Sequence, residues 1–185
     1  MASPGNPLAH QAKATALFVQ RRYEEAIPEY ETAISLDRNL WEAYGDLGVC
    51  KFFTGLVEDA IPLEEQAIRL SPRDPQNRLR YLWLGRALLL QSHLDNAISW
   101  FERARIANPK WPAPRAYLAS AYALKGDTER AASELTEARR LSSRDWYSSV
   151  TGLKAAVGYW GVPKVRELFE ATFFEGLRKA GMPEE

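Results

Sequence analysis

The side chains best suited to catalysis are few in this sequence and widely spaced. It holds one cysteine, Cys50, and two histidines, His10 and His93. A thiolate beside a histidine would make a nucleophile, and several His, Cys or carboxylate ligands together would hold a metal ion. Cys50 instead matches Ala87 and Ala121 in later repeats of a helical pattern, and the histidines occupy unrelated positions. We therefore expect neither a nucleophile nor a metal site.

Acidic residues also occur in neighbouring pairs, which would suit general acid and base chemistry. The pairs, at expected helix starts and on polar helix faces, are Glu24 and Glu25, Glu58 and Asp59, and Glu64 and Glu65. The helix dipole and solvation account for carboxylates at such positions. The sequence has no glycine-rich loop ahead of a Lys-Ser or Lys-Thr pair and no G-x-G-x-x-G motif. We predict a protein that is not an enzyme and uses no cofactor.

Composition excludes several other classes of protein. The 24 Lys and Arg residues balance 24 Asp and Glu residues, which argues against a nucleic-acid binder that relies on a basic field. A single cysteine excludes a disulfide framework. The most apolar stretch, Tyr81 to Leu90, contains Arg86 and is too short to span a bilayer. We predict a cytoplasmic protein with no nucleic-acid partner and no membrane partner.

Helices must position these residues, because one helical pattern recurs along the chain. The segment Tyr23 to Arg38 is repeated at Val57 to Pro72, Leu94 to Pro109 and, more weakly, Thr128 to Ser143. The equivalent alanines, successively 34, 37 and 34 positions apart, are Ala26, Ala60, Ala97 and Ala131. The extra residues of the middle interval fall in the loop from Pro72 to Asn77. A fixed period of this length indicates an array of helix pairs.

The period and its small residues resemble the tetratricopeptide repeat, a family of stacked helix hairpins. The resemblance covers residues 7–145. The small residue of the first helix falls on Ala14, Gly48, Gly85 and Ala119. A further small residue of the second helix falls on Ala33, Ala67, Ala104 and Ala138. Small side chains at these positions let a neighbouring helix approach closely.

The resemblance implies an all-α fold, a right-handed superhelical solenoid of antiparallel helix pairs. We expect a disordered tail at residues 1–6, followed by four repeats at residues 7–40, 41–74, 78–111 and 112–145. Residues 146–180 are expected to form a degenerate fifth hairpin that caps the array, with a C-terminal tail at 181–185. Its helices are expected at residues 146–159 and 164–180, joined by a turn at 160–163.

Two local features depart from a uniform repeat. Gly55 and Gly126 are expected to end the first helices of their hairpins with a positive φ, whereas repeat 1 has Arg21 and Arg22 there. Glu64 stands where the other repeats carry a large apolar residue. Glu64 is thus a departure from the family pattern in repeat 2.

The family binds its partners on a concave face lined by the first helix of each repeat, so the resemblance implies a protein-binding groove. Carrying over the family's positions gives Gln11, Thr15, Phe18, Asp46, Val49, Phe52, Leu82, Trp83, Arg86, Leu89, Tyr117 and Ser120. Leu79, Ala113 and Ala116 are further positions of this groove. The set is apolar and aromatic with few charges, which suits an amphipathic helix or an extended peptide.

The aromatic groove residues are the expected anchors of the partner. They are Phe18, Phe52, Trp83 and Tyr117, with Asp46 and Arg86 expected to orient the partner. Two alternatives stay open. Phe52 and Trp83 can instead belong to the core of their hairpins. The groove can also be filled by the chain's own last helix, which carries Phe169, Phe173 and Phe174.

One subfamily of these repeats grips the C-terminal carboxylate of chaperones with Lys and Asn side chains. At the corresponding positions this sequence has Gln11, Thr15, Asp46, Leu79 and Trp83. The basic and amide groups of that clamp are missing, so a chaperone C-terminal tail is a disfavoured partner.

We predict a non-catalytic scaffold whose partner is a protein or peptide. A first alternative is a regulatory C-terminal segment, since residues 52–76, 116–142 and 173–185 are similar to the C-terminal repeat regions of bacterial class III nucleotidyl cyclase or winged-helix regulators. That resemblance implies that any cyclase activity would reside in a missing N-terminal domain. A second alternative is self-association into a homo-oligomer, through the exposed end of repeat 1 or the aromatic C-terminal helix.

Overall fold

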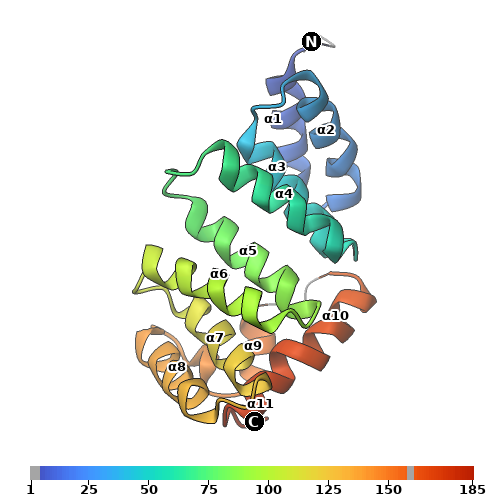
Figure 1. The fold of residues 1–185 in the computed structure, drawn as a ribbon. Coiled ribbons are helices and arrows are strands. Elements are labelled where there is room, and N and C mark those ends of the chain that lie inside the picture. Colours follow the sequence, from blue (N-terminus) through green and yellow to red (C-terminus); the bar gives the residue numbers. More distant parts are fainter. Residues whose placement is uncertain (1–4, 158–160) are drawn as a thin grey trace.

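A computed structural model describes residues 5–157 and 161–185, and Figure 1 shows the fold. The first helices of successive hairpins are α1 (Pro7–Val19), α3 (Trp41–Phe53), α5 (Asn77–Leu90) and α7 (Pro112–Leu124). Their second helices are α2 (Tyr23–Leu36), α4 (Val57–Leu70), α6 (Leu94–Ala107) and α8 (Thr128–Leu141). Each hairpin packs against the next, so the protein is an all-helical solenoid and the predicted fold class is confirmed.

The turn inside each hairpin requires one residue with a positive φ. Gly55 has a φ of 93° and Gly126 a φ of 85°, as the sequence predicted. The other two hairpins place a residue with a side chain there, with a φ of 61° at Arg21 and 60° at Ser92. Glycine adopts this conformation at little steric cost, whereas a Cβ atom makes it unfavourable. These two turns are therefore strained relative to the glycine turns.

Small residues lie where the helices approach most closely. The equivalent alanines of the second helices are at most 2% exposed, namely Ala26, Ala60, Ala97 and Ala131. At Gly85 in α5, a Cβ atom would lie 2.5 Å from the ring of Phe101 in α6. Phe101 is itself 0% exposed, so the ring fills the space that the glycine leaves. Close packing of this kind explains why the repeat pattern alternates small and large residues.

Further helical segments follow the fourth hairpin. The 3₁₀ helix η1 (Asp145–Tyr147) and the helix α9 (Val150–Val157) follow α8. Then come α10 (Pro163–Phe169), the π-helical η2 (Glu170–Phe174) and α11 (Glu175–Lys179), which we call together the C-terminal helix. The expected helix at 146–159 and turn at 160–163 fall partly outside the described residues, which exclude 158–160.

The C-terminal helix packs mainly on α7 and α5 (Figure 1). A Cβ atom at Gly176 would lie 2.5 Å from the backbone oxygen of Ser120, so α11 and α7 are in very close contact. At its N-terminal end, the backbone nitrogen of Val162 donates to the carbonyl oxygen of Phe53 at 3.2 Å. This placement on the concave side differs from the end cap that the sequence predicted. Its apolar face is buried against first helices rather than stacked on α8.

Both ends of the described chain are held by hydrogen bonds. The side chain of Asn6 accepts from the backbone nitrogen of Leu8 at 3.0 Å and caps α1; the rest of the expected tail, residues 1–4, lies outside the described residues. The backbone nitrogen of Val150 donates to the oxygen of Pro183 at 2.9 Å. Residues 181–185 were expected to form a C-terminal tail, and these residues are tied to the start of α9.

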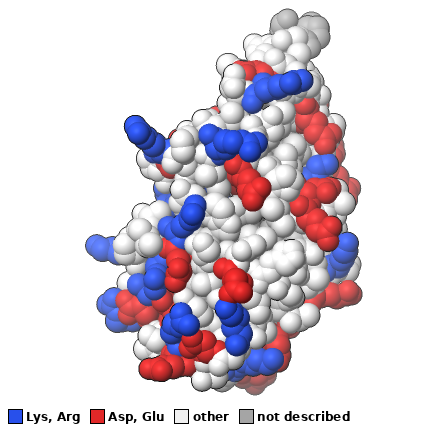
Figure 2. All heavy atoms as spheres, in the orientation of Figure 1, with Lys and Arg blue, Asp and Glu red and all other residues white. Residues whose placement is uncertain are grey.

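Charged side chains are scattered over the face of the array that Figure 2 shows. Figure 2 shows positive and negative residues interleaved over the face that α4, α6 and α8 present. The mixture of positive and negative side chains on this face agrees with the net charge of +0. Among the described residues, no helix has both the length and the apolar character needed to cross a membrane.

Candidate functional site

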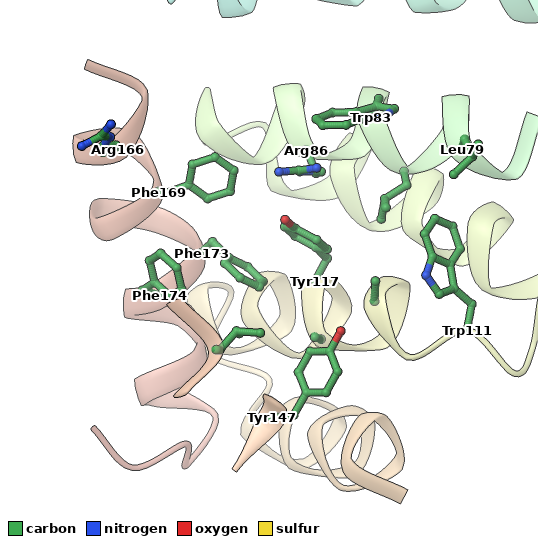
Figure 3. Close-up of a pocket in the computed structure, with 14 residues that line it drawn as sticks. Leu79, Trp83, Arg86, Trp111, Tyr117, Tyr147, Arg166, Phe169, Phe173 and Phe174 are labelled. Atoms are coloured by element: carbon green, nitrogen blue, oxygen red, sulfur yellow. The ribbon is translucent and has the colours of Figure 1, made fainter. Parts of the chain in front are cut away.

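The first helices of repeats 3 and 4 enclose a pocket together with the C-terminal segments (Figure 3). Its volume is about 250 Å³. We call it the aromatic pocket; it is lined by Leu79, Leu82, Trp83, Arg86, Trp111, Ala113, Ala116, Tyr117, Tyr147, Leu153, Arg166, Phe169, Phe173 and Phe174. The lining is almost wholly apolar, which is the usual character of a binding pocket with a few convergent polar groups.

Helical spacing explains why α5 supplies one wall of the aromatic pocket. Leu79, Leu82, Trp83 and Arg86 follow one another at intervals of three, one and three residues and so share one face of the helix. The same face of α7 supplies Ala113, Ala116 and Tyr117 one repeat later. Equivalent positions of adjacent repeats lie side by side, which joins the two faces into one wall.

The opposite wall comes from the C-terminal helix. Phe173 stacks on Tyr117 with ring centroids 4.2 Å apart, and Phe169 meets Phe52 edge-on at 5.9 Å. Phe169 and Phe173 are one helical turn apart, so both point to the same side. The chain's own last helix therefore fills part of the concave groove, which was one of the alternatives left open by the sequence.

Arg86 is the buried charge of the aromatic pocket. Its guanidinium carbon lies 4.0 Å from the ring centroid of Trp83 and 5.3 Å from those of Phe52 and Phe169. Tyr117 completes the cage at 5.4 Å, and Figure 3 shows its hydroxyl end directed toward the guanidinium. Burial lowers the pKa of Arg86 below its usual range, and the charge interaction with Tyr117 acts in the opposite direction. Arginine side chains are not deprotonated in folded proteins, so this is a buried charge.

The groove between repeats 1 and 3 is polar, in contrast with the aromatic pocket. Tyr30 in α2 connects Thr15 in α1 and Asp46 in α3, with oxygen–oxygen distances of 3.3 Å to each. Asp46 also accepts a hydrogen bond from Nη2 of Arg80 at 2.7 Å. Nη1 of Arg80 lies 3.7 Å from an oxygen of Glu64. This chain of contacts links three repeats, and we call it the polar network.

Glu64 is the most deeply buried carboxylate of the polar network. It is 1% exposed, and within the described ranges neither of its oxygens has a hydrogen-bond partner. Burial raises the pKa of Glu64 to about 8; Arg80 acts in the opposite direction, and the negative charge of Asp46 adds to the rise. Arg80 in turn occupies the space over Gly45, where a Cβ atom would lie 2.3 Å from the guanidinium. The acidic departure in repeat 2 is thus matched by a basic side chain from repeat 3.

The predicted groove residues divide into three groups. Leu82, Trp83, Arg86 and Tyr117 line the aromatic pocket together. Val49, Phe52, Leu89 and Ser120 are buried at 2% exposure or less, so they are core residues in this arrangement. Gln11, Thr15, Phe18 and Asp46 lie outside the aromatic pocket, where Gln11 bonds Glu42 and Phe18 packs on Tyr23.

Two expectations about single residues need correction. Asp46 was expected to orient a partner, but its carboxylate is taken up by Arg80 and Tyr30. Phe52 was expected to be an anchor, but it is 1% exposed and packs on Phe53 and Trp83 in the core. The burial of Phe52 favours the alternative that it belongs to the core, whereas Trp83 lines the aromatic pocket.

Several pocket residues were missed from the sequence. Trp111 precedes the first helix of repeat 4, and an aromatic residue directly before a helix-starting Pro112 is a signal that could have drawn attention. Tyr147, Leu153 and Arg166 lie past the last repeat. No repeat register extends to those residues, so no groove position could be carried over to them.

The groups considered for catalysis have structural environments. Cys50 is 0% exposed, and burial raises the pKa of its thiol to about 12. His10 Nδ1 lies 2.7 Å from a carboxylate oxygen of Glu29, and His93 precedes α6. Within the described ranges, no three His, Cys, Asp or Glu residues are grouped so that they could hold a metal ion.

Stacked hairpins with a concave groove define a class of helical-repeat protein. A family model described as Tetratricopeptide repeat matches residues 12–75 and 73–112. Because these matches cover more than half of the chain, the protein belongs to the tetratricopeptide repeat family, as the sequence motifs predicted.

Curated relatives match a part of the chain. This chain is 31% identical over 97 residues to the BBSome complex member BBS4 of Bos taurus. The matched segment makes up 52% of this chain and 18% of that protein. The BBSome complex member BBS4 of Mus musculus matches to the same extent. The matched segment thus spans less than a fifth of the length of these relatives.

Solved structures share the fold over nearly the whole chain. MamA from Desulfovibrio magneticus RS-1 has a TM-score of 0.70 at 15% identity, with 98% of this chain and 97% of that chain covered. YrrB, described as a TPR protein with an unusual peptide-binding site, has a TM-score of 0.68 at 17% identity, covering 96% and 88%. PilF of Pseudomonas aeruginosa has a TM-score of 0.70 at 17% identity, covering 97% and 73%. These likenesses show the fold.

Proposed function

We propose that this protein is a non-catalytic scaffold that binds a helical segment of another protein in its concave groove. The observation that carries the proposal is the C-terminal helix itself, which is seated against α5 and α7 through Phe169 and Phe173. A groove that accepts one amphipathic helix in this way accepts others with the same spacing of large apolar side chains. The family supports protein or peptide binding.

The aromatic pocket sets the chemistry of the partner. Trp83 and Tyr117 line it beside the apolar Leu82, and Phe173 stacks on the ring of Tyr117. Buried aromatic side chains at the centre of a contact are the residues that usually contribute most binding energy. We therefore assign the partner two large apolar side chains one helical turn apart, and its binding displaces Phe169 and Phe173. The peptide-binding site named for the similar YrrB structure supports peptide recognition on this fold.

A pair of tryptophan substitutions tests this proposal. Trp83→Ala removes a wall of the aromatic pocket, whereas Trp100→Ala removes a tryptophan that stacks on Tyr81 outside it. Proteins captured by the wild type and by Trp100→Ala should be depleted at least about tenfold with Trp83→Ala, the loss expected for a central anchor. Thermal melts of both variants show whether a loss of capture comes with a loss of stability. Equal capture by all three proteins would contradict the proposal.

The two alternatives from the sequence remain predictions. A regulatory role within a larger bacterial regulator rests on the sequence resemblance, and the upstream reading frame tests it. Self-association is tested by sedimentation velocity of the purified chain over a range of concentrations. Neither is favoured by a particular contact among the described residues, so neither replaces the scaffold as the proposed function.

A further inference from the structure

Arg86 is a buried arginine without an anionic partner in the part of the chain that the structure describes. It is 7% exposed, and its buried Nε, like that of Arg80, has no hydrogen-bond partner among the described residues. Among the residues that the structure describes, no carboxylate forms an ion pair with it, and the titratable group that acts on it is Tyr117. Buried charges in proteins are normally paired, because removing an ion from water is costly.

Arg80 shows what a paired arginine looks like in the same groove. It is 6% exposed, almost the same as Arg86, and lies six residues earlier in α5. Arg80 donates to Asp46 at 2.7 Å and lies 3.7 Å from Glu64. The Arg86 guanidinium instead lies against four aromatic rings, of which Trp83 is the nearest at 4.0 Å. Cation–π contacts offset part of the cost of burial but supply no negative charge.

The guanidinium faces the space inside the aromatic pocket (Figure 3). That space is about 250 Å³, and its lining includes the rings of Trp83, Tyr117 and Phe169. The second basic residue of the lining, Arg166, is exposed and donates its Nε to the oxygen of Gly161 at 3.0 Å. The interior therefore offers one buried positive charge within an apolar enclosure.

We propose that the aromatic pocket binds an apolar monocarboxylate, whose carboxylate pairs with the Arg86 guanidinium and whose apolar group lies against the aromatic walls. The planar fork of an arginine matches the two oxygens of a carboxylate. A single negative charge balances the single buried cation, whereas a phosphate dianion would bring a second charge into an apolar site. This site stands on Arg86 and does not require that the scaffold bind a helix.

The carboxylate has two possible sources, a free acid or the C-terminus of a peptide. Titration calorimetry on the full chain distinguishes them with 3-phenylpropanoate in one arm and acetyl-Gly-Gly-Phe with a free carboxylate in the other. Tighter binding of the free acid assigns a small-molecule ligand, and tighter binding of the peptide assigns a chain terminus. 3-Phenylpropanamide and phenyl phosphate serve as neutral and dianionic controls.

The decisive variant is Arg86→Met, which keeps an unbranched side chain and removes the charge. Binding of 3-phenylpropanoate should weaken about tenfold to a hundredfold, as expected for a charge-assisted pair. Its melting temperature should be unchanged or higher, because an unpaired buried cation is gone. Arg103→Met is the matched control, since Arg103 stacks on Trp100 at 4.4 Å outside the pocket.

The outcomes separate the proposal from its rivals. Carboxylate binding that is lost in Arg86→Met, kept in Arg103→Met and absent for the amide supports the site. No binding of either carboxylate to the wild type overturns it, as does equal binding of the amide or tighter binding of phenyl phosphate. If Arg86→Met does not fold, the comparison of acid with amide on the wild type still decides whether binding needs the carboxylate charge. Loss of helix capture in Trp83→Ala bears on the scaffold alone.

Discussion

Single residues decide how the two halves of the groove differ. In the polar network, Glu64 replaces the large apolar residue of the other repeats and is compensated by Arg80. The departure at Glu64 was visible in the sequence, but its partner was not, because Arg80 belongs to the next repeat and was not among the expected groove positions. Trp83 and Arg86, in contrast, could be placed from the repeat register alone, since helical spacing fixes which face they share.

Glu64 should make the stability of the fold depend on pH. Its pKa is 4.5 in an unfolded chain and about 8 when folded, so the stability that Glu64 contributes is full below pH 4.5 and is lost as the pH rises toward 8. The free energy of unfolding should fall by up to about 1.4 kcal/mol per pH unit across this interval. Glu64→Gln removes the titration and should remove this slope in urea unfolding. Parallel pH profiles of the two proteins would contradict the assignment.

Among the helices, the repeat hairpins and the C-terminal helix differ in how far they could be predicted. Four hairpins follow from the spacing of small residues, because a Cβ atom at a position such as Gly85 would collide with Phe101. Past Asp145 the register ends, and an amphipathic face alone does not say which surface it covers. The C-terminal helix was therefore expected at the end of the array, whereas it packs on α7 and α5.

The hairpin turn at Ser92 should gain stability from glycine. Its φ of 60° is unfavourable for a residue with a Cβ atom. Ser92→Gly should raise the free energy of unfolding by up to about 1 kcal/mol, measured by urea denaturation. Ser71→Gly is the control, because Ser71 has a φ of −135° and glycine there should lower stability by about 0.5–1 kcal/mol. A loss at Ser92 as large as at Ser71 would show that the turn is not strained.

The whole molecule combines a rigid array with a groove that its own chain partly fills. The polar network ties repeats 1 to 3 together, and the aromatic pocket lies between repeats 3 and 4 and the C-terminal helix. A partner that enters the aromatic half must replace the contacts of Phe169 and Phe173. The affinity for a partner then depends on how firmly the C-terminal helix is held.

The point of closest contact offers a way to release the C-terminal helix within the full chain. A side chain at Gly176 would meet the backbone of Ser120, so Gly176→Leu should push α11 away from α7. Ala171→Leu adds a side chain of the same size at an exposed position of the same helix and serves as the control. Circular dichroism melts establish that the repeat array stays folded in both variants.

The most direct measurement is the binding of a fluorescently labelled peptide of residues 163–180 to these proteins, followed by anisotropy. The peptide should bind Gly176→Leu at least about tenfold more tightly than the wild type or Ala171→Leu, because only there is the groove free. A peptide with Phe169 and Phe173 replaced by alanine should not bind. If the array of Gly176→Leu is folded and the unaltered peptide still does not bind it, the concave groove is not a helix-binding site.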